Sequence, residues 1–241
     1  MEKLNGINID YKDLKNIRKL GEGRDAIIYS APNGLAFKMY KNPEEDRFID
    51  AIQKIQRNKY DVKLSDLPLG AIYINDEFKG VLLKRIHGFQ IHKVFGLLSR
   101  KSQIAILKRI VAATKELTDN YIYPADLANT PFLPGKSSNI LLDYKKIPHL
   151  IDIDGSGAFY AGGEYSEGQE VTNMGLSMLF LDLIFGEPVL NEPELRDVDY
   201  LCYRLNKLGF NKYLSQKLSH YEANYSQIED AIDTYEKIKV L

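Results

Sequence analysis

Short runs in which apolar and polar residues alternate fill the first third of the chain, and turn residues separate them. The segment 26–41 holds two such runs around Pro-Asn-Gly, and Asn-Gly is a strong signal for a hairpin turn. Two further runs flank Asn-Asp-Glu-Phe-Lys-Gly within 69–86. An earlier run, 15–23, ends in a glycine-rich turn. The pattern predicts about five strands in consecutive hairpins before residue 87.

The spacing of apolar residues lengthens to that of helices in the rest of the chain. Between the two hairpins, Asn42-Pro43 places proline at the first position of an expected helix over 43–57. Residues 91–119 and 168–240 also have helical spacing. Two short strands are expected between them, and their ranges are 139–143 and 149–153. The sequence therefore predicts an α+β fold with a small antiparallel β lobe (1–87) and a larger helical lobe (88–241).

Composition and charge are ordinary for a soluble globular protein of 241 residues. The 32 basic and 33 acidic residues give a net charge of −1, which argues against a general nucleic-acid binder. The longest apolar run, 174–186, is shorter than a membrane span and contains Asp182, so a buried helix is expected. The single cysteine, Cys202, cannot form an internal disulfide. We therefore expect a cytoplasmic protein with no nucleic-acid and no membrane partner.

A glycine turn and a lysine one hairpin later form the first candidate site. Gly21 and Gly23 lie between two predicted strands, where glycine lets a backbone approach a phosphate closely. Ala36 and Lys38 alternate onto the same face of the next strand. The small Ala36 would leave room for an adenine ring, and Lys38 would reach the α- and β-phosphates. Taken alone, each feature is better explained as an ordinary turn or a solvent-exposed lysine.

Two side chains with oxygen donors form the second candidate site. Asn139 opens one of the two short strands, and Asp152 lies near the end of the other. A hairpin through Tyr-Lys-Lys-Ile-Pro would bring these two ends together. Amide and carboxylate oxygens are suited to Mg²⁺ that also binds phosphates. The pair therefore indicates a metal-nucleotide site.

In this order, the segments resemble those of the protein kinase superfamily in its compact bacterial eukaryotic-like form, over roughly residues 15–187. Gly-Glu-Gly-Arg-Asp-Ala-Ile-Ile resembles the glycine-rich loop, and Leu-Ala-Phe-Lys resembles the V-A-I-K strand. Asn-Ile-Leu-Leu and Leu-Ile-Asp-Ile-Asp resemble the metal-binding asparagine strand and the D-F-G segment. The run 170–187 resembles a helix that anchors the large lobe. The resemblance implies a bilobal protein-kinase-like fold that binds ATP and Mg²⁺.

The same resemblance implies roles for individual residues. Asp126 would be the catalytic base, Lys38 would hold the phosphates, and Asn139 and Asp152 would be the metal ligands. The implied ATP-binding residues are Gly21, Gly23, Ile28, Ala36, Lys38, Glu45, Leu83, Lys84, Ile86 and Leu141. Leu83 would guard the adenine pocket, the backbone of Lys84 and Ile86 would pair with the base, and Leu141 would close the pocket floor. Glu44, Asp46 and Asp50 compete with Glu45 as the acid that pairs with Lys38.

The chain departs from the family pattern around the proposed base. Asp126 and Asn139 are 13 residues apart in place of the usual five, so residues 128–138 would bulge outward as an insertion. The dipeptide before Asp126 is Pro-Ala, where the family has His-Arg. Asp154 replaces the glycine of D-F-G, so this segment could supply one carboxylate or two. Lys136 could touch the γ-phosphate or be an ordinary loop lysine.

The predicted function is that of an ATP- and Mg²⁺-dependent kinase. It would transfer the γ-phosphoryl group to a hydroxyl acceptor, with serine or threonine of a protein as the expected acceptor. Two alternatives stay open. The missing His-Arg and the long insertion fit a pseudokinase scaffold that binds nucleotide. The missing A-P-E motif and the short segment 155–169 fit a small-molecule phosphotransferase that acts on an antibiotic or a metabolite.

Overall fold

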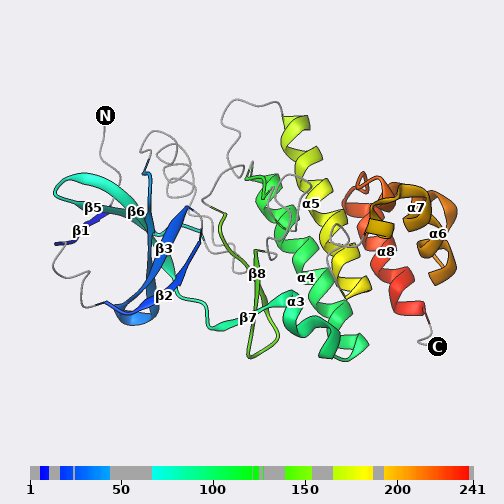
Figure 1. The fold of residues 1–241 in the computed structure, drawn as a ribbon, viewed down its shortest axis with the longest axis horizontal. Helices are drawn as coiled ribbons and strands as arrows, with labels where there is room; N and C mark the ends of the chain where they lie inside the picture. The colour runs from blue at the N-terminus through cyan, green and yellow to red at the C-terminus, as the bar shows by residue number, and fades with distance from the viewer. Residues whose placement is uncertain are drawn as a thin grey trace. The chain divides into compact units, whose positions relative to one another are not determined.

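The computed structural model divides the chain into two compact units, Met1–Ile86 and His87–Leu241. The sequence placed this boundary one residue later. The fold is mixed α+β: a six-stranded sheet in the N-terminal unit, and a three-stranded sheet with six described α-helices in the C-terminal unit (Figure 1). The structure describes residues 6–10, 17–23, 25–43, 67–120, 122–124, 127, 139–153, 165–186 and 193–238.

The six strands of the N-terminal unit are joined mainly by hairpins. Their bounds are β1 Gly6–Asn8, β2 Lys19–Glu22, β3 Ala26–Ala31, β4 Leu35–Tyr40, β5 Gly70–Ile74 and β6 Glu77–Lys84. The order across the sheet is β1-β5-β6-β4-β3-β2. The hairpins predicted over 26–41 and 69–86 are therefore confirmed, as β3–β4 and β5–β6.

One strand corrects the expectation of a purely antiparallel sheet. β1 was not predicted, and it pairs in parallel with β5, so that Gly6 lies opposite Ala71. All three of its residues are exposed, so it has no buried face that an alternating pattern could reveal. Its pairing depends on a strand more than 60 residues away in the sequence.

Both predicted hairpins close through turns whose two central residues have left-handed backbone. In the first, Asn33 and Gly34 have φ of 58° and 73°, and the Leu35 N–H donates to the Pro32 carbonyl. In the second, Asn75 and Asp76 have φ of 51° and 64°. Positive φ at both central residues defines the type I′ turn, whose twist matches that of paired strands. Glycine, asparagine and aspartate adopt this conformation more readily than other residues.

The C-terminal unit has a small antiparallel sheet followed by helices. Its strands are β7 Gly88–Gln90, β8 Ile140–Asp143 and β9 Pro148–Leu150, in the order β7-β8-β9. The sequence predicted two strands here, and β7 is the additional one. The helices are α3 Ile91–Val94, α4 Arg100–Asp119, α5 Tyr165–Phe185, α6 Val198–Leu208, α7 Lys212–Ser219 and α8 Tyr225–Lys237.

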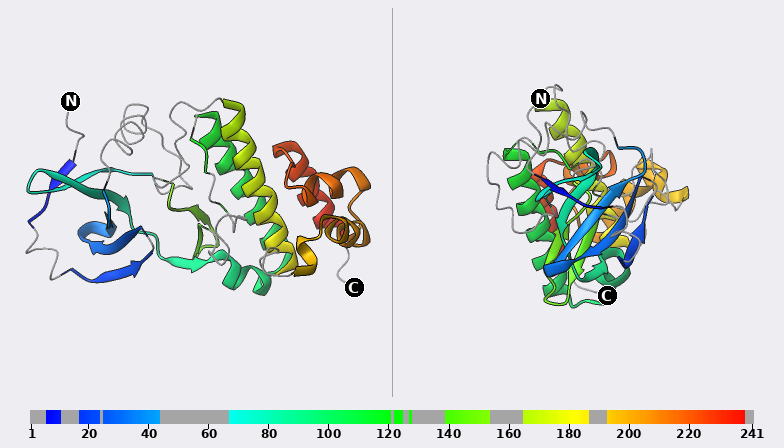
Figure 2. Two further views of the ribbon diagram at one scale, coloured as in Figure 1. Left: turned by 45° about the horizontal axis from the view of Figure 1, so that its top comes forward. Right: turned by 90° about the vertical axis from the view of Figure 1, so that its left-hand side faces the viewer.

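Helices α4 and α5 lie side by side in the C-terminal unit, as the left view of Figure 2 shows. The apolar run 174–186 falls in α5 and its glycine end, and Phe180 within it packs edge to face against Phe210 and Tyr235. The prediction of a buried core helix is therefore confirmed. Among the described residues, no helix combines the length and apolar character needed to cross a membrane.

Candidate functional site

One face of the N-terminal sheet gathers four of the proposed ATP-binding residues. Ile28 on β3 lies directly opposite Lys38 on β4, and Ala36 on β4 lies opposite Leu83 on β6. Residues directly opposite each other in a sheet have side chains on the same face. Ala36 and Lys38, two residues apart, share that face as well. Residues far apart in the sequence are thus placed together by the register of three adjacent strands.

Lys38 is buried on this face, so it is not the solvent-exposed lysine that its sequence context favours when taken alone. Only 6% of the surface of Lys38 is exposed. Val81, which is fully buried, lies opposite it on β6. Its ammonium lies over the ring of Tyr40, with Nζ 5.4 Å from the ring centroid. A buried lysine is rare unless its charge is compensated, so this position is a candidate functional site.

The glycine turn differs in one detail from a loop that presents every N–H to a phosphate. The N–H of Gly23 donates to the Ala26 carbonyl at 2.8 Å, so it is used within the hairpin. Gly21 is paired with Ile28 across β2–β3. A Cβ at Gly21 would meet nothing within 4 Å. The backbone of the turn is therefore open on that side, but the Gly23 amide is not available to a ligand.

Glu22 forms ion pairs with two lysines beside this turn. Lys19 is a close hydrogen-bond donor to Glu22, and Lys41 Nζ lies 2.6 Å from Glu22 Oε1. The hydrogen bond from Lys19, followed by that from Lys41, lowers the pKa of the Glu22 carboxyl to about 2. The pair with Lys41 links the end of β2 to the residue that follows β4, whereas the pair with Lys19 lies within β2.

We expect an NMR titration to give Glu22 a pKa of about 2, below its ordinary value of 4.5. A carboxyl whose pKa is lower in the folded state stabilises the fold fully above the unfolded pKa, and that contribution is lost as the pH falls from about 4.5 to about 2. Lys19→Met should raise the measured pKa more than Lys41→Met does. A Glu22 that titrates at its ordinary value would contradict these ion pairs.

The remaining N-terminal candidates lie at the end of β6 and just after it. The Lys84 side chain is exposed and Ile86 is half-buried. Lys84 lies opposite Leu35 at the last paired position of β6. Ile86 follows the strand, so its backbone groups do not belong to the sheet ladder.

In the C-terminal unit, the β8–β9 hairpin brings Asn139 close to the residue before Asp152. Ile140 lies opposite Leu150, and beyond this pair the Ile151 N–H donates to the Asn139 carbonyl at 2.9 Å. Asp152 is the next residue. The hairpin therefore brings Asn139 next to the residue before Asp152, as the sequence predicted. This contact lies at the end of the hairpin opposite its turn.

At the opposite end of the hairpin, the carboxylate of Asp143 accepts hydrogen bonds within the turn. Asp143 accepts hydrogen bonds from the Lys145 and Ile147 N–H groups, both at 2.8 Å, and His149 Nε2 lies 3.3 Å from its Oδ2. Burial opposes ionisation, but these hydrogen bonds lower the pKa of Asp143 overall. Asp143 thus stabilises the turn, at the end of the hairpin opposite to Asn139 and Asp152.

Asp152 has a backbone conformation that few residues adopt easily. Its φ is 62°, in the left-handed region. Aspartate and asparagine tolerate this region better than most residues other than glycine, and such conformations are over-represented at functional sites. Leu141, the proposed pocket floor, is half-buried and lies opposite His149, on the side of the sheet away from the buried Ile140 and Leu142.

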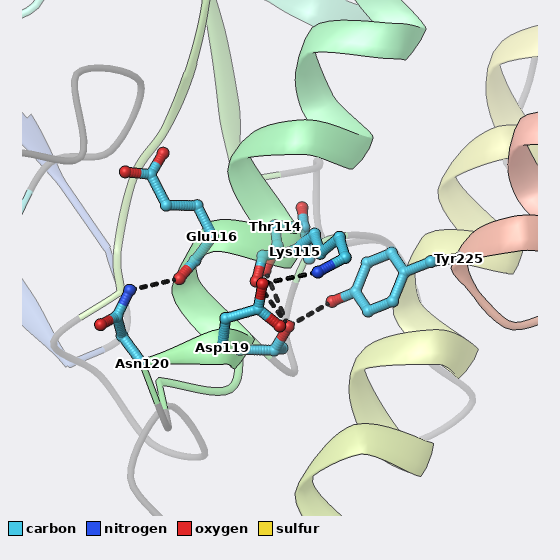
Figure 3. Close-up of polar contacts among 7 residues, drawn as sticks. Thr114, Lys115, Glu116, Asp119, Asn120 and Tyr225 are labelled. Atoms are coloured by element: carbon cyan, nitrogen blue, oxygen red, sulfur yellow. Dashed lines mark hydrogen bonds and ion pairs between the residues drawn. The ribbon is translucent and has the colours of Figure 1, made fainter.

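The segment that leads to Asp126 is anchored firmly at the end of α4. The Ile122 N–H donates to the Leu117 carbonyl at 2.9 Å. Figure 3 shows a neighbouring contact, in which the Asn120 side chain donates to the Glu116 carbonyl at 2.7 Å. The Tyr225 hydroxyl of α8 lies 2.9 Å from Thr118 Oγ1. The chain therefore leaves α4 in a direction fixed by both helices.

The described neighbours of Asp126 are all buried. They are Ile122, Tyr123, Pro124 and Leu127. Helix α5 approaches this segment closely, because a Cβ at Gly168 would lie 2.6 Å from the Tyr123 ring. The packing of a glycine against this ring holds the chain that precedes the proposed base.

Several predictions fall outside the described residues. They concern Asp126 itself, Glu45 and its competing acids, the helix over 43–57, Lys136, the insertion 128–138 and Asp154. Among the residues that are described, no three His, Cys, Asp or Glu side chains lie close enough together to hold a metal ion. Mg²⁺ commonly takes one or two protein carboxylates together with substrate phosphates. Asp152 has one such carboxylate, and the Asn139 side chain has an amide oxygen.

Sequence reasoning missed two residues that contact Lys38. One is Tyr40, whose ring lies beneath the ammonium. The other is Gly80, where a Cβ would overlap the Lys38 carbonyl oxygen. A glycine in the interior of a predicted strand is a signal of close backbone approach, and it could have identified Gly80. Strand alternation places Tyr40 on the face of Lys38, but it does not reveal the contact.

Comparison of the chain with protein-family models gives no match, and comparison with curated proteins gives no significant one.

Proposed function

We propose that the protein is an ATP- and Mg²⁺-dependent kinase of bilobal protein-kinase-like fold. It transfers the γ-phosphoryl group of ATP to a hydroxyl acceptor, with serine or threonine of a protein as the expected acceptor. The observation that carries the proposal is the buried Lys38, with Ile28 directly opposite it and Ala36 and Leu83 on the same sheet face. A small residue, apolar side chains and one buried cation suit an adenine ring and its phosphates.

The position of Lys38 within the sheet supports the same proposal. Counted from β2, which carries the glycine turn, β4 is the third strand along both the chain and the sheet. A lysine on the third strand of a sheet whose first two strands flank a glycine-rich loop is the structural context expected for a kinase V-A-I-K motif. The arrangement also explains why Ala36, two residues earlier, has to be small if a flat ring lies on this face.

The C-terminal unit supports the proposal through its hairpin. Asn139 and Asp152 are brought to one end of β8–β9, and Asp143 is engaged in the turn at the other end. The proposed roles follow the division of labour in phosphoryl transfer, which requires positioning and charge neutralisation. Lys38 holds the α- and β-phosphates, Asn139 and Asp152 hold Mg²⁺, and Asp126 orients the acceptor hydroxyl and accepts its proton.

The proposal is tested by incubating the purified chain with γ-labelled ATP and Mg²⁺, together with candidate protein and small-molecule acceptors. We expect labelled product that depends on Mg²⁺ and falls about 100-fold or more in Lys38→Met, because a buried charge that stabilises phosphates is removed. Lys79→Met is the matched control, since Lys79 lies on the neighbouring strand β6 and its ammonium pairs with Glu77 at the surface. It should retain activity.

The same assay separates the proposal from its alternatives. Thermal stabilisation by Mg-ATP without any labelled product would contradict the kinase and favour a scaffold that binds nucleotide. Labelled small molecules without labelled protein would support phosphoryl transfer from ATP, but the acceptor would then be a small molecule and not a protein. No stabilisation and no product would overturn nucleotide binding altogether.

A further inference from the structure

The surroundings of Lys38 point to a residue that acts through it. We propose that Tyr40 is a positioning residue: its ring face holds the Lys38 ammonium in place for the phosphates before any nucleotide binds. This inference rests on the proposed function, because it gives Lys38 the role of a phosphate-binding group. It assigns to the aromatic core beneath Lys38 a part in nucleotide recognition.

The burial of Lys38 requires a compensating interaction in the absence of phosphates. The whole Lys38 residue is only 6% exposed, so its ammonium has lost most of its hydration. The face of an aromatic ring carries partial negative charge and attracts a cation within about 6 Å of its centroid. Lys38 Nζ lies 5.4 Å from the centroid of Tyr40. The ring therefore compensates part of the lost hydration of the ammonium.

The Tyr40 ring is itself held in place by other aromatic rings. Its centroid lies 6.1 Å from that of Phe78 on β6, and Phe78 lies 6.1 Å from Tyr73 on β5, edge to face. All three residues belong to one buried cluster. We call these three rings the aromatic shelf. Since each ring comes from a different strand, the shelf fixes the orientation of Tyr40 through the sheet.

Close approach of two strands brings the shelf to Lys38. Gly80 on β6 pairs with Met39 on β4, and it has no room for a side chain against the Lys38 backbone. Phe78 lies two residues before Gly80 on the same strand. The missing side chain at Gly80 thus allows β6, with its ring, to pack directly against the strand that carries Lys38 and Tyr40.

The decisive comparison is between Tyr40→Phe and Tyr40→Leu. Phenylalanine keeps the ring face, whereas leucine keeps a buried apolar side chain without it. We expect Tyr40→Leu to raise the KM for Mg-ATP about 2- to 30-fold, the range that corresponds to a cation–π contact, and Tyr40→Phe to remain near wild type. Tyr73→Leu is the control for general damage to the core, because it removes the ring of the shelf at the far end of the series, which packs on Phe78.

A second readout needs no catalytic activity. Protein labelled with ¹³C in its lysines, without nucleotide, should show an upfield-shifted Lys38 ε-methylene signal, assigned by its absence in Lys38→Met. That shift should persist in Tyr40→Phe and Tyr73→Leu and be lost in Tyr40→Leu. Loss of core packing alone would not produce this pattern, because Tyr73→Leu disturbs the same cluster.

The outcomes distinguish this inference from the proposed function. If wild-type protein neither binds nor turns over Mg-ATP, the proposed function fails, and the positioning role fails with it. If Mg-ATP is turned over, but Tyr40→Leu leaves both the KM and the Lys38 signal unchanged, only the inference is overturned. If Tyr40→Phe is as impaired as Tyr40→Leu, the hydroxyl is responsible rather than the ring face, and the inference is again wrong.

Discussion

Replacing Asp126 by asparagine should lower the rate of phosphoryl transfer by about 100- to 10,000-fold, the usual contribution of a general base. Asparagine preserves the size of the side chain but cannot accept the proton of the acceptor hydroxyl. The role of Asp126 comes from the resemblance to kinases, and its described neighbours Tyr123, Pro124 and Leu127 are buried. Steady-state rates at saturating Mg-ATP measure the effect, and the binding of Mg-ATP should change little.

Asp152→Asn should reduce the rate comparably, but through the metal, so its activity should respond to a higher Mg²⁺ concentration. Asp143→Asn is the matched control, because it alters a carboxylate of the same hairpin that serves the turn. It should lower stability and leave the rate constant nearly intact. Activity that persists in both Asp126→Asn and Asp152→Asn would refute the proposed mechanism, and the scaffold interpretation would then be preferred.

Gly80→Ala should destabilise the N-terminal unit by about 3 kcal/mol or more, since the added methyl group overlaps the Lys38 carbonyl oxygen and neither backbone can yield easily. Hydrogen exchange of the β4 and β6 amides measures this local effect better than a global melt, because the chain has two units that need not unfold together.

Gly21→Ala is the matched control for this substitution. It adds the same methyl group to a strand of the same sheet, where nothing lies within 4 Å of the new atom. Exchange of the β4 and β6 amides should stay close to that of wild type. Equal acceleration of exchange in both variants would mean that the close approach at Gly80 is not what stabilises this part of the sheet.

The sequence predicted the hairpins because their signals are local. Asn33-Gly34 and Asn75-Asp76 favour tight turns by their own conformational preferences, and the alternating residues beside them determine the faces of the strands. β1 and β7 escaped prediction for the opposite reason. Each has three residues, and each is defined by a partner strand about 50 or more residues away in the chain. Such pairing is a property of the assembled sheet.

The candidate site was likewise predictable only where its signals are local. Strand alternation correctly placed Ala36 and Lys38 on one face, and the hairpin correctly joined the ends near Asn139 and Asp152. The burial of Lys38 was not predicted, because it depends on strands and rings contributed by β5 and β6. The engagement of the Gly23 amide likewise depends on the register of its hairpin. Local pattern identifies which residues share a face, but not what covers them.

The left-handed backbone at Asp152 also bears on how this position can change during evolution. Asparagine and glycine accept such a conformation as readily as aspartate does, whereas a β-branched residue would be strained. Without selection for a carboxylate, lineages should therefore drift toward asparagine or glycine at no cost in folding. Retention of aspartate across divergent relatives would be evidence of selection for its charge, since the backbone alone does not demand it.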